Sequence, residues 1–190
     1  MKRYVLPALI LAALSSSEAW AHTGHGAATG FMLGFSHPLS GLDHVLAMTA
    51  VGLWAGSLGR LAIFGLPVSF LSAMVLGFWA ALMGSGIPMI ELGITASVLG
   101  LGLAVMLNLQ PSLIPAAGAC GLFGIFHGYA HGAEIAPAVS ALDYGFGFLL
   151  ASTLLLGCGL GLQSAVRRVP ATSRIFGGGV ALAGAALFLV

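Results

Sequence analysis

The sequence predicts an all-α bundle of six membrane-spanning helices after a cleaved signal peptide, with the first span broken. Three observations lead to this prediction: a strongly apolar composition, an N-terminus typical of export, and apolar stretches divided by glycine and proline. Hydrophobic residues make up 59% of the 190-residue chain and charged residues only 6%. Because a soluble domain carries about 25% charged residues, the predicted solvent for most of this surface is lipid.

The N-terminus has the three parts of a secretory signal peptide. A basic start is followed by the short apolar run Val5–Leu14 and by Ala19-Trp20-Ala21, an A-x-A cleavage site. We therefore predict that residues 1–21 are removed and that a single transmembrane domain, residues 22–190, begins at His22. The alternative is an uncleaved first transmembrane helix. With cleavage, the protein is expected in the bacterial inner membrane as a multi-pass protein whose mature N-terminus is periplasmic.

Apolar stretches near the length of about 20 residues needed to cross a bilayer define the predicted spans. The ordinary ones are Leu61–Met83, Ile87–Leu107, Leu113–His131, Val139–Leu162 and Ile175–Val190. The remaining segment, Gly30–Gly59, is too long for one straight span and carries helix breakers over His37–Gly41. We predict a half-helix, a break, and a full helix from about Ser40 to Ser57. Broken helices of this kind recur at transporter binding sites.

Charge placement predicts the orientation of the bundle. With the mature N-terminus outside, six spans place Arg60, Arg167, Arg168 and Arg174 all in the cytoplasm, which agrees with the positive-inside rule. The same topology places every carboxylate of the mature chain toward the outer half.

Small residues at four-residue spacing predict close helix packing. Gly124, Gly128 and Gly132 form one such stripe, and Gly157 and Gly161 form a shorter one. We interpret both as packing surfaces.

Histidines and carboxylates carry the candidate chemistry. His127, His131 and Glu134 stand at i, i+4 and i+7 and so share one helical face. Imidazole and carboxylate groups are ligands for divalent metals such as nickel, cobalt or zinc, and ionisable groups within a bilayer are functional candidates. The predicted metal ligands of the bundle are His37, Asp43, His44, Glu91, His127, His131 and Glu134. His22 and His25 would gather metal outside, unless His25 belongs only to a loose tail.

Structural roles compete with metal binding at several of these positions. Ser40 and Asp43 have the spacing of a capping box that starts a helix. Glu91 and Asp143 could be favourable first-turn charges, and His44 could simply bond a backbone carbonyl. A lone histidine would decide nothing, but two histidine–carboxylate clusters on different helices favour a site.

Two motifs resemble the signatures of the HupE/UreJ family. The run His37-Pro38-Leu39-Ser40-Gly41-Leu42-Asp43-His44 is similar to its H-P-x-x-G-x-D-H motif, and Phe126–Glu134 is similar to its F-H-G-x-A-H-G-x-E block. The resemblance implies a secondary permease for nickel, or for cobalt, that supplies hydrogenase or urease. The family's functional positions would fall on His37, Asp43, His44, Glu91, His131 and Glu134, and Phe70 also matches a family position.

The function expected is therefore transport of a divalent metal ion across the lipid bilayer, with no enzymatic activity and no permanently bound cofactor. Net charge is only +1, which gives no indication of nucleic-acid binding. One alternative is a membrane electron carrier with haem held by His44 and by His127 or His131. Others are a membrane metallo-enzyme and a non-transporting partner of metallocentre assembly.

Overall fold

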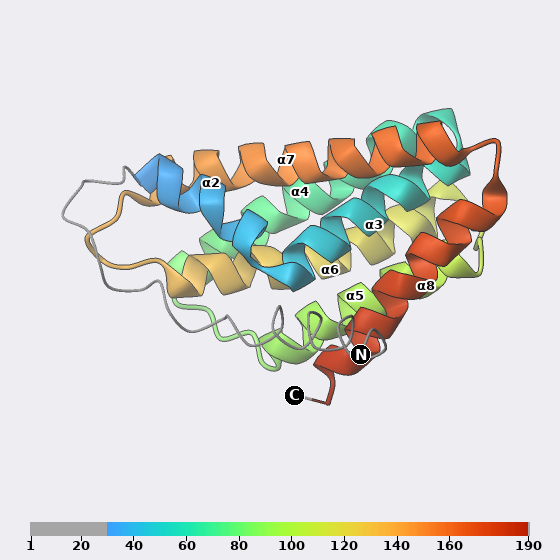
Figure 1. Ribbon diagram of the computed structural model, residues 1–190. Helices are drawn as coiled ribbons and strands as arrows, with labels where there is room; N and C mark the ends of the chain where they lie inside the picture. Colours follow the sequence, from blue (N-terminus) through green and yellow to red (C-terminus); the bar gives the residue numbers. More distant parts are fainter. Residues whose placement is uncertain (1–29, 190) are drawn as a thin grey trace, which may run out of the picture.

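The computed structural model describes residues 30–189, and these residues form an all-α bundle (Figure 1). The predicted signal peptide, its cleavage site, His22 and His25 lie outside the described residues. The helices of the described part are α2 (Gly30–Ser40), α3 (Leu42–Leu58), α4 (Arg60–Leu82), α5 (Ile90–Met106), α6 (Leu113–Glu134), α7 (Ala141–Val166) and α8 (Pro170–Leu187).

Three of these helices, α4, α6 and α7, are long and apolar enough to cross a membrane, which marks the chain as a membrane protein. Helices α3 and α5 and the Ala171–Leu187 part of α8 are apolar but shorter. The count of six spans and their orientation stay predictions.

Several helix boundaries differ from those predicted, and proline explains two of the differences. Helix α8 begins at Pro170 rather than at Ile175, because the fixed φ of proline suits the first position of a helix. Helix α5 begins at Ile90 rather than at Ile87, since Pro88 disfavours helical backbone at the residue before it. Helix α6 continues to Glu134, which adds the last residue of the predicted metal-binding face to the helix.

The predicted break of the first span is narrower than the sequence suggested. Helix α2 runs through His37 and Pro38 to Ser40, and only Gly41 is extended, with φ −86° and ψ 115°. Pro38 has no N–H to donate to the carbonyl of Gly34, which weakens the last turns of α2 without ending it. Helices α2 and α3 therefore meet at an angle at Gly41 (Figure 1).

Close packing joins the helices into groups, of which α4 with α6 is the most extensive. A Cβ placed on Gly128 would lie 1.9 Å from the carbonyl oxygen of Met74, and Gly124 and Gly132 approach α4 backbone in the same way. The predicted packing role of this stripe is confirmed, and its partner is α4. Helices α2 and α3 pack on α7, while α5 and α8 run side by side (Figure 1).

The second predicted stripe does not pack within the described chain. A Cβ on Gly157 or Gly161 would meet no described atom within 4 Å. Helix α7 instead presents Gly159 to α3, where its Cβ would lie 2.2 Å from the carbonyl oxygen of Thr49. The prediction was wrong because Gly157 and Gly161 lie on a different side of α7 from Gly159.

Candidate metal site

An outer cluster of His37, His131 and Glu134 joins the end of α2 to the end of α6. Each residue offers one ligand atom, and these atoms all lie within 4.8 Å of one another. The Glu134 carboxylate accepts from His37 Nε2 at 3.3 Å, and the rings of His37 and His131 meet edge to face with centroids 4.6 Å apart. Two imidazoles and one carboxylate at this spacing are a ligand set for a divalent transition metal.

The outer cluster opens into a cleft of about 270 Å³. His37 and Glu134 line this cleft, together with Ser36, Ser40 and Tyr144. The side chains of His37 and Glu134 are 40% and 54% exposed, whereas His131 is fully buried. The cluster therefore has one face toward the cleft and one toward the protein interior.

A continuous row of imidazole rings leads inward from this cluster. The His131 ring lies 4.4 Å from that of His44, and the His44 ring lies 4.7 Å from that of His127, measured between centroids. Exposure is 7% at His44 and 0% at His127. The row alternates between helices, since His37 and His44 come from α2 and α3 and the other two come from α6.

The two inner rings have polar partners. His44 Nδ1 lies 2.8 Å from Asp43 Oδ1, which also accepts from the His44 backbone N–H at 2.9 Å. His127 Nε2 lies 2.8 Å from the hydroxyl oxygen of Ser97. Among the described residues, three ring nitrogens of the row are buried without a hydrogen-bond partner, namely Nε2 of His44, Nδ1 of His127 and Nε2 of His131. Buried polar atoms are normally satisfied, so three in one row require an explanation.

Two of the competing structural roles do not hold. The hydroxyl of Ser40 donates back to the carbonyl of His37 at 2.7 Å, and Gly41 begins α3 without a side-chain cap. Asp43 is thus free of the capping box that its spacing suggested. His44 uses its ring nitrogen on the Asp43 carboxylate and not on a backbone carbonyl.

The other two carboxylates lie apart from the row. Glu91 is exposed in the first turn of α5, and within residues 30–189 it forms no ion pair with a histidine. The structure therefore does not bring Glu91 to the cluster. Asp143 is exposed in the first turn of α7, where its N–H donates to the Ser140 hydroxyl at 3.3 Å.

The sequence reasoning missed two neighbours of the row, Ser97 and Tyr144. The Tyr144 hydroxyl lies 3.4 Å from His131 Nδ1. The backbone of α2 packs closely against this tyrosine, since a Cβ added to Gly34 would lie 2.0 Å from the carbonyl oxygen of Tyr144. A hydroxyl in an otherwise apolar span was the available signal for Ser97, since such groups commonly bond across helices.

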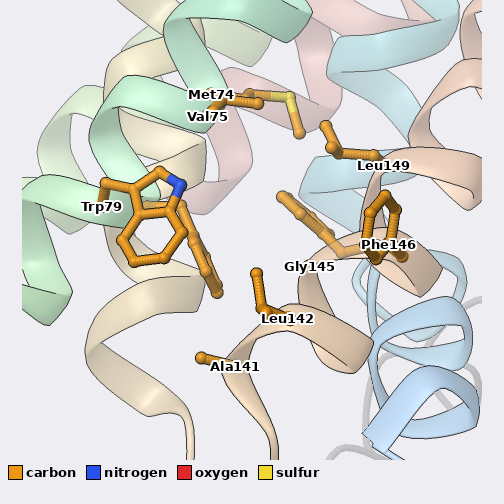
Figure 2. Close-up of a pocket in the computed structure, with 10 residues that line it drawn as sticks. Met74, Val75, Trp79, Ala141, Leu142, Gly145, Phe146 and Leu149 are labelled. Carbon is orange, nitrogen blue, oxygen red and sulfur yellow. The ribbon is translucent and has the colours of Figure 1, made fainter.

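A second pocket, between α4 and α7, has a different character (Figure 2). Its volume is about 130 Å³, and Met74, Trp79, Leu142 and Phe146 are among the residues that face it. None of its lining residues is a histidine or an acid. It therefore offers a cation none of the ligands present in the histidine row.

Comparison with known proteins gives two matches. The family described as HupE / UreJ protein matches residues 9–187. A protein named Protein HupE from Rhizobium leguminosarum bv. viciae is 41% identical over 182 residues, which cover 94% of this chain and 95% of that protein. No solved structure matches the chain significantly.

Proposed function

The chain belongs to the HupE/UreJ family, and we propose that it is a secondary permease for a divalent transition metal ion, nickel or cobalt. The metal would supply the maturation of hydrogenase or urease. The observation that carries this proposal is the row of four imidazoles that begins at the outer cluster and ends in the protein core. In this proposal the metal is the substrate, and the protein has no enzymatic role.

The ligand chemistry supports a transition metal. Neutral imidazole suits nickel, cobalt and zinc, whereas magnesium and calcium prefer oxygen ligands. The row offers imidazole nitrogens at each step and a carboxylate at Glu134 and Asp43. These carboxylates would offset the charge of the cation as it leaves water, a transfer that is otherwise expensive at membrane depth.

In the proposed topology the metal path runs from the periplasm toward the cytoplasm. The outer cluster would face the periplasm, where the cleft admits a hydrated ion. Next to His127 the path is closed by Phe70, whose ring centroid lies 5.7 Å from that of His127 and which has no exposed surface. Release toward the cytoplasm would therefore require helices to move, as in alternating access.

The spacing of the rings argues against the haem alternative. His44 meets both His127 and His131 with centroids no more than 4.7 Å apart. A porphyrin between two axial histidines would need these rings on opposite sides of its plane, and direct ring contact leaves no room for it.

Uptake of metal by the purified protein in liposomes tests the proposal. Nickel uptake should be reduced by cobalt more than by manganese, because manganese binds nitrogen ligands most weakly. Glu134→Gln removes the carboxylate of the outer cluster and should lower uptake at least about tenfold. Asp143→Asn is the matched control, since Asp143 is another exposed carboxylate but lies outside the row. If wild-type liposomes take up no metal, the permease is refuted in favour of a non-transporting assembly partner.

A further inference from the structure

We infer that Ser97 is a positioning residue for an inner cation position formed by His44 and His127, which we call the inner pair. This inference rests on the proposed function, because it adds a second holding point to the same path. The outer cluster would receive the ion, and the inner pair would hold it at the end of the row. The evidence is a pair of hydrogen bonds. Ser97 bonds one ring nitrogen of His127 and Asp43 bonds one ring nitrogen of His44, which leaves the other nitrogen of each ring free.

The tautomer of His127 follows from the single proton of the Ser97 hydroxyl. Ser97 Oγ lies 2.6 Å from the carbonyl oxygen of Ile94 and 2.8 Å from His127 Nε2. The carbonyl of Ile94 can only accept, so the Ser97 hydroxyl donates its hydrogen to that carbonyl, and the hydroxyl oxygen accepts a hydrogen bond from the Nε2–H of His127. His127 therefore carries its proton on Nε2 and has a lone pair on Nδ1. That nitrogen is buried and has no hydrogen-bond partner within residues 30–189.

Asp43 has the same effect on His44. A carboxylate accepts, so His44 donates from Nδ1 across 2.8 Å and keeps a lone pair on Nε2. This nitrogen is also buried, and no group in the described part of the chain hydrogen-bonds to it. A carboxylate that fixes the far nitrogen of an imidazole is a recurring partner of metal-bound histidine. Ser97 supplies the corresponding contact to His127.

The two rings with free lone pairs are neighbours, with centroids 4.7 Å apart. Both free nitrogens are acceptors, so they cannot satisfy each other, and either a cation or a hydrogen-bond donor is needed. A cation fits this requirement, and a buried water is the competing occupant. His131 could deliver the cation, because its ring contacts both His37 of the outer cluster and His44 of the inner pair.

The test uses full-length protein in detergent with Co²⁺ alone as the probe. In a background with His22→Ala and His25→Ala, which removes the predicted N-terminal metal ligands, the double variant His37→Ala/Glu134→Gln disables the outer cluster, and one Co²⁺ per chain should still bind at the inner pair. Adding Ser97→Ala should weaken this binding about ten- to a hundredfold, the usual effect of losing such a partner. Ser152→Ala is the matched control, because Ser152 is equally buried and its hydroxyl bonds the carbonyl of Phe148 but none of the described histidines.

Nitrogen NMR of histidine-labelled protein separates positioning from a merely structural effect. In metal-free protein His127 should show the proton on Nε2, and Ser97→Ala should shift the populations of the two tautomers. Ser152→Ala should leave the His127 signals unchanged.

Three results would overturn the inference: no Co²⁺ binding in the double variant, equal loss in Ser97→Ala and Ser152→Ala, or a His127 proton on Nδ1. If wild-type liposomes take up nickel and Glu134→Gln does not, any of these results refutes the inner pair and leaves the permease intact. Absence of wild-type uptake refutes the permease instead.

Discussion

A methyl group at Gly128 tests whether the close approach of α4 and α6 holds the histidine row in place. The added Cβ would lie 1.9 Å from the carbonyl oxygen of Met74, and 2.6 and 2.7 Å from two further backbone atoms of that residue. Backbone cannot move aside as a flexible side chain can. Reaching an ordinary contact of 3.4 Å requires the two helices to separate locally by about 1.5 Å.

The expected effects of Gly128→Ala follow from this displacement. Overpacking of this kind costs about 1–3 kcal/mol, and contact with rigid backbone favours the upper end, about 3 kcal/mol. Gly128 follows His127 directly and lies one turn before His131, so both proposed ligands move with it. A site tolerates only about 0.5 Å of such movement, so we expect metal uptake to fall about ten- to a hundredfold.

Gly118→Ala is the control within the same helix, because a Cβ there would meet no described atom within 4 Å. It should leave uptake unchanged and, if anything, stabilise α6 by about 0.5–1 kcal/mol through helix propensity. The measurements are the free energy of unfolding in a detergent titration and uptake by liposomes that contain equal amounts of protein. Equal behaviour of the two variants would refute the argument that backbone contact positions the row.

Three further predictions concern single side chains and topology. Asp43→Asn keeps an oxygen acceptor for the backbone N–H of His44 but removes the negative charge. Metal uptake should therefore fall about ten- to a hundredfold while the protein stays in the membrane. Normal uptake would show that Asp43 is not part of the metal path. Tyr144→Phe should reduce metal uptake by no more than about tenfold, since the Tyr144 hydroxyl makes one long contact, 3.4 Å, to His131. Complete loss of uptake would contradict this minor role of the hydroxyl. A reporter fused after Arg168 should behave as cytoplasmic, and a periplasmic signal there would reverse the proposed orientation of the outer cluster.

Periodicity within one helix predicted much of the site. The spacing of His127, His131 and Glu134 placed them on one face of a helix, and the glycines beside them predicted the close approach of a neighbour, which α4 provides. Both predictions depend only on the geometry of a single helix. The extent of the break near Pro38 could not be predicted so well, because α2 can lose one hydrogen bond at a proline and still continue.

What sequence could not predict is which helices meet. Glu91 and Ser97 lie on the same helix, α5, and the charge of Glu91 made it the more conspicuous candidate. The rotation of α5 turns Ser97 onto His127 and leaves Glu91 exposed, and this rotation is set by packing against other helices. The same reasoning explains α7, where Gly159 rather than Gly157 or Gly161 faces a neighbour.

The division of the proposed ligands between helix groups connects this packing to the proposed transport. His37 and His44 belong to α2 and α3, which pack on α7, whereas His127 and His131 belong to α6, which packs on α4. Every ring-to-ring step of the row therefore crosses from one group to the other. A small movement between the two groups would change all three steps together without unfolding either group, because the glycines of these helices that approach neighbouring backbone do so within a group and not between the two groups. Such an arrangement allows a bound cation to be held or released by rigid-body motion, which an alternating-access permease requires.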